Sequence, residues 1–226
     1  MRIGGLQRLT LIDYPGKVAA IVFTQVCNFR CPYCHNPELV LPACFGPAIL
    51  EDEVLSFLEK RRGQLTGVVV TGGEPTQQSD LMSFLGKIKE LEYAIKLDTN
   101  GSHPYILKEA LRRHLVDYIA MDIKGPLKEY RKVAGTEVLT ENIRKSVEII
   151  RASQIPYEFR TTMVKPLLSV QDLPGIMDLI SGAPEYKIQM FRPCEKILDK
   201  TLLDKNHYTE DEINVIRKKY CPNYLP

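Results

Sequence analysis

Hydrophobic residues along the chain fall into two alternating patterns. Short and nearly continuous apolar runs, rich in β-branched residues, are typical of strands buried on both faces of a parallel sheet. The stretches between them carry apolar residues three and four positions apart, which is the spacing of one helix face. The patterns predict six strands, at residues 18–24, 67–71, 94–98, 117–122, 157–164 and 185–191, and six helices, at residues 50–62, 79–91, 104–115, 140–152, 169–181 and 209–219.

This alternation indicates an α/β fold with a mainly parallel sheet. Eight strand–helix units close a TIM barrel, which typically needs about 250 residues. Six units in 226 residues therefore favour a partial (β/α)6 TIM-like barrel that stays open, with a flat doubly wound sheet as the competing topology. We expect a single domain over residues 1–226, with its core over residues 12–192 and a C-terminal helical extension over residues 193–226.

Composition narrows the function classes. The chain is 44% hydrophobic and 26% charged, with a formal net charge of +2 at pH 7. This balance gives no reason to expect nucleic acid or an acidic membrane surface as a partner. No apolar run approaches the roughly 20 residues that a membrane-spanning helix needs, and the N-terminus lacks a targeting pattern. We therefore expect a cytoplasmic protein with no membrane partner, whose six cysteines stay reduced or bind metal.

Three cysteines in the loop after the first predicted strand are the strongest chemical signal. Cys27, Cys31 and Cys34 have the spacing C-x3-C-x2-C. Three thiolates on one tight loop can hold three corners of a cubane 4Fe–4S cluster, whereas a full protein set has four cysteines. One iron is then left without a protein ligand, and a substrate or cofactor can bind there. The spacing favours a catalytic cluster over one that only stores electrons.

A structural zinc site and a disulfide framework are the alternatives for these cysteines. Cys31 and Cys34 form a C-x2-C pair, but structural zinc usually takes four ligands. The second pair is missing, because Cys44, Cys194 and Cys221 are scattered singly. Disulfide frameworks belong to small secreted domains, whereas this chain is long. We expect the three scattered cysteines to be ordinary thiols.

Polar residues follow almost every predicted strand. In parallel α/β sheets, ligands bind at the edge formed by the carboxyl ends of the strands. Each motif alone could be a simple turn, because Asn-Gly is a strong turn signal and Asp often forms Asx-type turns. Their joint placement predicts one shared cavity. The strand-end residues are Cys27; Gly72, Gly73 and Glu74; Asp98, Thr99, Asn100 and Gly101; Asp122 and Lys124; and Gln189 to Arg192. Arg160 lies within the fifth predicted strand.

Two of these motifs together resemble the radical S-adenosylmethionine (SAM) enzymes. The triplet with an aromatic residue before its last cysteine, Cys27-x3-Cys31-Pro32-Tyr33-Cys34, is similar to the superfamily signature, and Gly72-Gly73-Glu74-Pro75 resembles its GGE motif. The likeness runs from about residue 12 to residue 192. It implies a partial (β/α)6 barrel in which the three cysteines hold a 4Fe–4S cluster. The amino and carboxylate groups of SAM would bind the fourth iron.

The resemblance also implies which residues contact the cofactor. Tyr33 would lie near the adenine, and Gly72, Gly73 and Glu74 would contact the methionine amino end. Lys124 and Arg160 would face the carboxylate and ribose of SAM. Asn100 and Gln189, both at strand ends, complete the expected cofactor-binding set.

A narrower likeness is to the glycyl radical enzyme activases, such as the pyruvate formate-lyase activase. It is carried by residues 12–17 (IDYPGK), Cys34-His35-Asn36-Pro37, Asp98-Thr99-Asn100-Gly101 and Asp122-Ile123-Lys124. The segments GLQRLTLIDYPGK and FTQVCNFRCPYCHNPELV are most similar to anaerobic ribonucleoside-triphosphate reductase activating proteins. The likeness implies an oxidoreductase that installs a glycyl radical on a partner enzyme, with that reductase as the expected partner. Flavodoxin or ferredoxin would supply electrons.

The activases also suggest a cation site. In them an aspartate pair holds a monovalent cation beside the SAM carboxylate. Carried over, the pair is Asp98 and Asp122, assisted by the carbonyls of Thr99 and Ala120. Two departures are visible: no cysteine-rich ferredoxin-like module stands between the triplet and GGE, and residues 190–192 (MFR) replace a histidine that follows the sixth strand of the formate-lyase activase.

Two other functions remain open. The 7-carboxy-7-deazaguanine synthases share the cysteine spacing but act on a small pterin, and residues 13–17 with His35-Asn36-Pro37 argue for the activases instead. A non-enzymatic zinc- or cluster-binding interaction protein is the second alternative. It leaves GGEP, DTNG and DIK unexplained.

Overall fold

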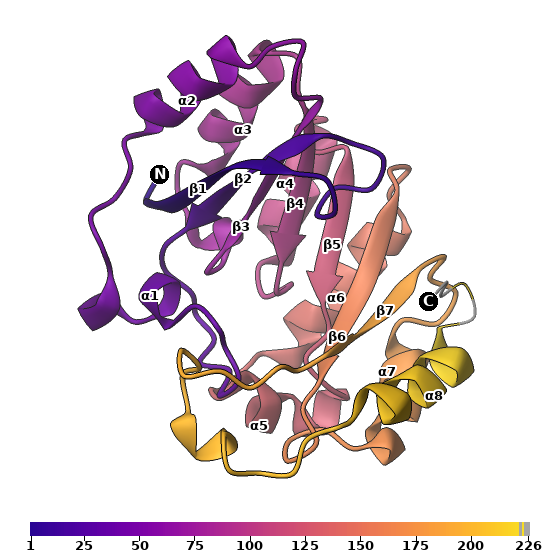
Figure 1. Cartoon of the computed structure of the whole chain (residues 1–226). Coiled ribbons are helices and arrows are strands. Elements are labelled where there is room, and N and C mark those ends of the chain that lie inside the picture. The colour runs from indigo at the N-terminus through magenta and orange to yellow at the C-terminus, as the bar shows by residue number, and fades with distance from the viewer. Residues whose placement is uncertain (222, 224–226) are drawn as a thin grey trace.

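Seven β-strands form one sheet through the centre of the chain (Figure 1). The structure is a computed structural model that describes residues 1–221 and residue 223, so residues 222 and 224–226 of the predicted C-terminal extension lie outside the described part. β1 runs antiparallel to β2, and every other neighbouring pair is parallel. The strands are β1 (Ile3–Thr10), β2 (Ala19–Thr24), β3 (Gly67–Gly72), β4 (Ala94–Thr99), β5 (Tyr118–Asp122), β6 (Tyr157–Met163) and β7 (Tyr186–Met190).

Helices fill the connections between the strands. Each of the six predicted strands and six predicted helices is present, with its ends within four residues of the prediction. Two short helices, α1 and α5, were not predicted. Within the described residues the helices are α1 (Pro37–Val40), α2 (Glu51–Lys60), α3 (Leu81–Glu90), α4 (Pro104–Arg112), α5 (Tyr130–Ala134), α6 (Thr140–Arg151), α7 (Leu173–Leu179) and α8 (Glu210–Tyr220).

The order of the strands confirms the predicted open barrel. The strands lie in the sheet in their sequence order, from β1 to β7. A doubly wound sheet would reverse its order at a switch point, whereas here every parallel strand adds to the same side of the one before it. Right-handed crossovers then bring the helices to one face, and Figure 1 shows the sheet curling with most helices outside. β1 and β7 remain edge strands, so the barrel does not close.

β1 is the strand that the sequence pattern did not predict. Its sequence, IGGLQRLT, has two glycines and no continuous apolar run, and residues 7–9 are exposed. It pairs with β2 alone and has two register shifts. Edge strands are half-exposed and often irregular, so they lack the signal of a buried parallel strand.

Alternate strand residues face two different layers. On β3, Val68 and Val70 join the main core with Leu58 of α2 and Phe84 of α3, while Val69 faces the barrel interior. This follows from the two-residue period of a strand. The apolar runs are therefore continuous because both faces are covered.

Residues 11–18 close the barrel at the amino ends of the strands. Tyr14 is buried there against Tyr118, together with Ala19, Ile21 and Val69. The IDYPGK motif therefore lies at the end of the barrel opposite the cysteines. Among the described residues, no helix is long and apolar enough to cross a membrane.

Candidate active site

A cavity of about 440 Å³ opens at the carboxyl ends of the parallel strands. All three cysteines of the triplet line it, and so does every residue of the predicted cofactor-binding set. Sequence reasoning placed these residues at strand ends, and the curled sheet brings the strand ends together. The predicted residues are Cys27, Tyr33, Cys31, Cys34, Gly72, Gly73, Glu74, Asp98, Thr99, Asn100, Asp122, Lys124, Arg160 and Gln189; the others are Phe29, His35, Asn36, Val40, Thr71, Thr162 and Met190.

The cysteine loop folds directly after β2. Cys31 and Cys34 lie on one turn, in which the Cys34 N–H donates to the Cys31 carbonyl oxygen (2.9 Å). The Cys27 sulfur accepts from the Phe29 N–H (3.4 Å) and lies 3.9 Å from the side-chain nitrogen of Asn100. Burial raises the pKa of Cys27 to about 12 and also raises the pKa of Cys31 and Cys34. These thiols therefore keep their protons at neutral pH unless a metal displaces them.

The helix α5 supports the loop from one side. The Arg30 N–H donates to the carbonyl oxygen of Ala134 (2.9 Å), the last residue of α5. The next residue, Gly135, has φ +67°, and a Cβ there would lie 2.0 Å from the Arg30 carbonyl oxygen. Only glycine allows this conformation and this close approach together. The guanidinium of Arg30 also donates to the carbonyls of Cys27 (2.6 Å) and Phe29 (2.7 Å).

The segment after β7 supports the loop from another side. The N–H groups of Leu198 and Asp199 donate to the carbonyls of Cys34 (3.0 Å) and Pro32 (2.8 Å). Phe191, which is buried, packs its ring against those of Tyr33 and His35. The cysteine loop is thus held by segments that are about 100 and 160 residues away in the sequence, and local pattern could not reveal these contacts.

The three thiols fit a cluster better than a single zinc ion. Among residues 1–221 and 223, no three His, Cys, Asp or Glu side chains come together as ligands of one metal ion. In a cubane each cysteine needs to reach only its own iron, so three spaced sulfurs on one wall of a cavity suffice. The hydrogen-bond donors near Cys27 are also of the kind that tune such clusters.

The GGE motif joins three strand ends. A Cβ on Gly73 would lie 2.2 Å from the Val26 carbonyl oxygen, so the absence of a side chain lets β3 touch the start of the cysteine loop. Glu74 is buried and accepts hydrogen bonds from the hydroxyl of Thr99 (2.7 Å), the N–H of Asn100 (2.6 Å) and both the N–H and hydroxyl of Thr76. Burial raises the pKa of Glu74, although these hydrogen bonds oppose the shift.

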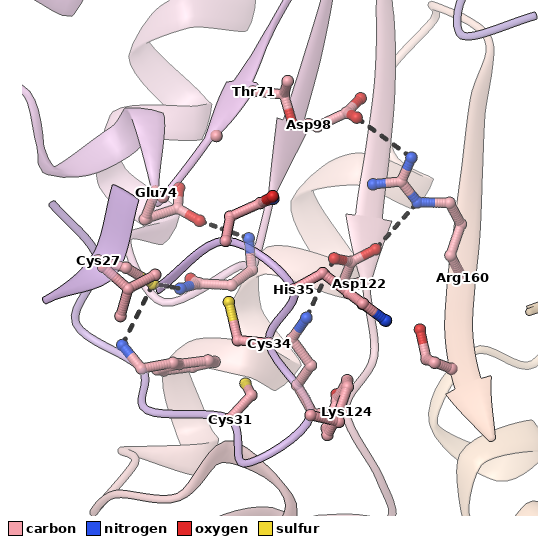
Figure 2. Close-up of a pocket in the computed structure, with 18 of the residues that line it drawn as sticks. Cys27, Cys31, Cys34, His35, Thr71, Glu74, Asp98, Asp122, Lys124 and Arg160 are labelled. Atoms are coloured by element: carbon pink, nitrogen blue, oxygen red, sulfur yellow. Dashed lines mark hydrogen bonds and ion pairs between the residues drawn. The ribbon is translucent and has the colours of Figure 1, made fainter. Parts of the chain in front are cut away.

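A row of charged side chains crosses the inner wall of the cavity. The Arg160 guanidinium lies between Asp98 (3.2 Å) and Asp122 (2.9 Å), and Lys124 pairs with the other oxygen of Asp122 (3.0 Å), as Figure 2 shows. Lys96 binds Asp98 from the far side. Burial alone would raise the pKa of Asp122, but the charges of Arg160 and Lys124 outweigh it and hold that pKa below its usual value.

This row bears on the predicted cation site. The two carboxylates expected to hold a monovalent cation are both engaged by the Arg160 guanidinium. The cation site stays a prediction.

The rim of the cavity contains residues that sequence reasoning did not assign to the site. His35 lines the cavity beside Met190, and its Nε2 lies 2.7 Å from the Arg192 carbonyl oxygen. Thr162 donates from its hydroxyl to the Gln189 side-chain oxygen (3.3 Å). His35 follows Cys34 in a quoted motif, and that adjacency was the available signal. Thr162 follows Arg160 by two positions on β6, so strand period alone could have placed it.

Comparisons with known proteins agree with these features. A family model described as the Radical SAM superfamily matches residues 21–180. A protein of Methanocaldococcus jannaschii named as a glycyl-radical enzyme activating enzyme is 30% identical over 99% of this chain and 94% of its own length. A protein of Pyrococcus horikoshii named as a GTP 3',8-cyclase is 28% identical over 68% of this chain and 49% of its own length. The solved structure of Streptococcus suis SuiB bound to S-adenosylmethionine superimposes with a TM-score of 0.67 at 15% identity, covering 88% of this chain and 45% of that one.

Proposed function

The chain belongs to the radical SAM superfamily, and from this premise we propose that it is an activase that removes a hydrogen atom from a glycine of a partner enzyme. As a member of that superfamily it is an enzyme that uses a 4Fe–4S cluster and SAM to generate a radical. Its partner would be a glycyl radical enzyme, with the anaerobic ribonucleoside-triphosphate reductase as the first candidate. Flavodoxin or ferredoxin is the candidate electron donor.

The residues of the cavity would divide the work of binding. Cys27, Cys31 and Cys34 would hold the cluster through its three protein-bound irons. When bound, the cluster and SAM would supply the one-electron chemistry that removes a hydrogen atom from the partner's glycine. Lys124 and Arg160 would bind the carboxylate and ribose of the cofactor.

Other residues of the cavity would orient the cofactor. Glu74 and the backbone of Gly72 and Gly73 would face its amino end, and Tyr33 would lie near its adenine. The strand-end positions of Thr99 and Asn100 fit contacts to the same cofactor. The chain supplies position and a partly dry surrounding, and the cofactors supply the reactivity.

The interior of the barrel is filled by side chains, and this observation supports a protein rather than a small molecule as the substrate. Tyr14 and Tyr118 close the amino-terminal end, and the buried side chains of Lys96 and Glu158 occupy the interior between them and the cavity. A cavity of about 440 Å³ has the size for one cofactor-sized ligand. A substrate must then reach the cofactor from the open mouth, as a loop of a partner protein can.

Charge pairing argues against a nucleotide substrate. Among the described residues that line the cavity, Lys124 and Arg160 are the lysine and arginine side chains, and each is paired with an aspartate. Because both cations are assigned here to SAM, a triphosphate would bring several further negative charges to a wall that has no other lysine or arginine to bind them. The GTP-cyclase relative therefore shares the fold and family without supporting GTP as the substrate here.

Anaerobic reconstitution tests the proposal. The purified chain should take up about four irons and, with reductant, release 5′-deoxyadenosine from SAM. Mixing it with the anaerobic reductase of the same genome should give a glycine-centred radical by electron paramagnetic resonance. Cys31→Ala should lose iron and radical formation, whereas Cys44→Ala, at an exposed cysteine outside the cavity, should keep both.

Two outcomes would contradict the proposal. If deoxyadenosine is released only when GTP or a pterin is added and no protein radical forms, the activase assignment is wrong. If a single zinc ion is bound in place of iron, the enzyme cannot perform this chemistry.

A further inference from the structure

His35 stands at the mouth of the cavity in a fixed orientation. Its Nε2 lies 2.7 Å from the carbonyl oxygen of Arg192, just beyond the end of β7. A carbonyl oxygen can only accept, so Nε2 carries the proton and Nδ1 is left as an acceptor in the neutral ring. The ring also packs on buried Phe191 at 5.4 Å between centroids. Figure 2 shows His35 among the side chains that line the cavity.

Gln189, on β7, offers a hydrogen-bond donor to complement the acceptor of His35. Its side-chain oxygen accepts from the Thr162 hydroxyl (3.3 Å), which orients the amide. Among the described residues, the Gln189 amide nitrogen and the His35 Nδ1 have no hydrogen-bond partner. Both residues line the same cavity and are solvent-exposed. The rim therefore presents one fixed acceptor and one fixed donor.

The rim side chains His35, Thr162 and Gln189 include no carboxylate, lysine or arginine, whereas the row of Asp98, Asp122, Lys124 and Arg160 is largely buried. The side chain of Arg192, just beyond β7, is 77% exposed, and its guanidinium lies 3.5 Å from the Glu210 carboxylate. An uncharged ligand that offers both a donor and an acceptor fits such a rim. A peptide backbone has these two groups on every residue.

We propose that His35 and Gln189 form a peptide-amide subsite, in which His35 Nδ1 accepts from a backbone N–H and the Gln189 amide donates to a backbone carbonyl of the substrate loop. This rests on the proposed activase function and adds how the glycine segment is held at the mouth. Gln189 is then a substrate-binding residue, although its strand-end position first suggested the cofactor. Hydrogen bonds to the backbone position the loop without reading its side chains.

Peptide binding by the reconstituted protein tests the subsite. The probe is a ten-residue peptide with the radical-glycine sequence of the anaerobic reductase from the same genome, labelled for fluorescence anisotropy. His35→Phe keeps the ring on Phe191 but removes both nitrogens, and Gln189→Met removes the amide at similar size. Each should weaken binding about five-fold, which is the size of one net hydrogen bond. His35→Gln, which restores an acceptor, should recover part of the loss.

A second set of peptides locates the bond itself. Each backbone N–H within two residues of the glycine is replaced in turn by an ester oxygen. One of these esters should bind wild type about five-fold more weakly and bind His35→Phe no more weakly than the parent peptide does. Gln64→Met, the same change at an exposed glutamine between α2 and β3, serves as the control and should bind like wild type.

The outcomes separate this inference from the function on which it rests. If the wild-type chain forms no glycyl radical on the peptide or the reductase, the proposed function fails. If the radical forms but His35→Phe binds the peptide as wild type does, or every ester acts equally on both proteins, the subsite is wrong while the function stands. A loss of iron or of SAM affinity in His35→Phe would also overturn it, since the residue would then act on the cofactors.

Discussion

Tyr14 packs its ring against Tyr118 with 5.9 Å between the ring centroids, at the end of the barrel opposite the cysteine loop. The two residues come from the β1–β2 connection and from the start of β5. Their contact gives the IDYPGK motif a structural role: it closes the barrel floor. A motif that resembles those of the activases thus lies far from the reacting atoms.

The packing of Tyr14 against Tyr118 predicts that Tyr14→Ala destabilises the fold. Removing a buried aromatic ring leaves a cavity among Ala19, Ile21 and Tyr118, which should cost about 3 kcal/mol of unfolding free energy. Urea unfolding followed by circular dichroism measures it. Tyr14→Phe keeps the ring and should stay within about 0.5 kcal/mol of wild type. Equal stability of the two variants would show that the ring does not fill the floor.

The close contact of Gly135 with the cysteine loop predicts that a substitution outside the cysteine motif weakens cluster binding. Alanine there would be strained at φ +67° and would meet the Arg30 carbonyl oxygen at 2.0 Å, so the cysteine loop must move. We expect Gly135→Ala to lose more than about half of the iron bound on reconstitution. Iron analysis of the purified protein measures it.

Gly63 offers a matched control for that change. It has a similar φ of +77°, but an added Cβ meets nothing within 4 Å. Gly63→Ala should therefore cost only about 1 kcal/mol of stability and bind iron normally. If both variants retain iron equally, the contact between α5 and the loop does not hold the cysteines in place.

Strand and helix positions were predictable because each buried strand is a continuous apolar run. The same logic placed Asp98, Asp122 and Arg160 on one edge, since parallel strands end together. Sequence did not predict β1, whose exposed residues carry no apolar period, nor the support of the cysteine loop by Gly135 and residues 198–199. Those contacts join segments far apart in the chain, and only the folded backbone brings them together.

Which charged side chains pair with one another also could not be predicted from the sequence. Arg160 was assigned to the cofactor and the aspartates to a cation, yet their side chains meet one another. The sequence gives each residue's strand and end, but the length and direction of a guanidinium decide which carboxylates it reaches. His35 was missed as a rim residue for a similar reason, because its position depends on the carbonyl of Arg192.

The lowered pKa of Asp172, a residue outside the cavity, predicts how the stability of the fold depends on pH. Its carboxylate accepts from the N–H (2.8 Å) and hydroxyl (2.7 Å) of Ser169, at the start of the 3-10 turn over residues 170–172 that leads into α7. Burial would raise its pKa, but these bonds and the charges of Lys128 and Lys132 lower it below the usual 3.8. A carboxylate with a lowered pKa stabilises the fold above its unfolded pKa, and this is lost as the pH falls through the folded pKa.

The measurement compares unfolding free energies of wild type and Asp172→Asn between pH 3 and pH 7. Wild type should be more stable by somewhat less than about 1 kcal/mol at pH 7, since the Asp172 carboxylate is only partly buried and solvent screens its charge. The difference should shrink below pH 4. A difference that is constant with pH would mean that the Asp172 charge does not contribute.

The hydrogen bonds of Glu74 predict that Glu74→Gln lowers both the stability of the fold and the affinity for SAM. The two oxygens of Glu74 accept four hydrogen bonds. Two come from Thr76, and the two from Thr99 and Asn100 tie the end of β3 to the end of β4. In Glu74→Gln one oxygen becomes an NH₂ donor, so at least one buried N–H or hydroxyl loses its acceptor, at about 1–3 kcal/mol. Because Asn100 and Thr99 line the cavity, the affinity for SAM should fall about ten-fold, as equilibrium dialysis would measure.

Asp117→Asn separates the two effects. Asp117 accepts from the Ile95 N–H (2.6 Å) and binds Lys89, and so supports the opposite end of β4. Its loss should lower stability while SAM affinity stays at the wild-type value, because no cavity residue moves. If Glu74→Gln weakens stability and SAM binding no more than Asp117→Asn does, Glu74 merely stabilises the sheet. A selective loss of SAM binding would instead assign to Glu74 the alignment of the β3 and β4 ends around the cofactor.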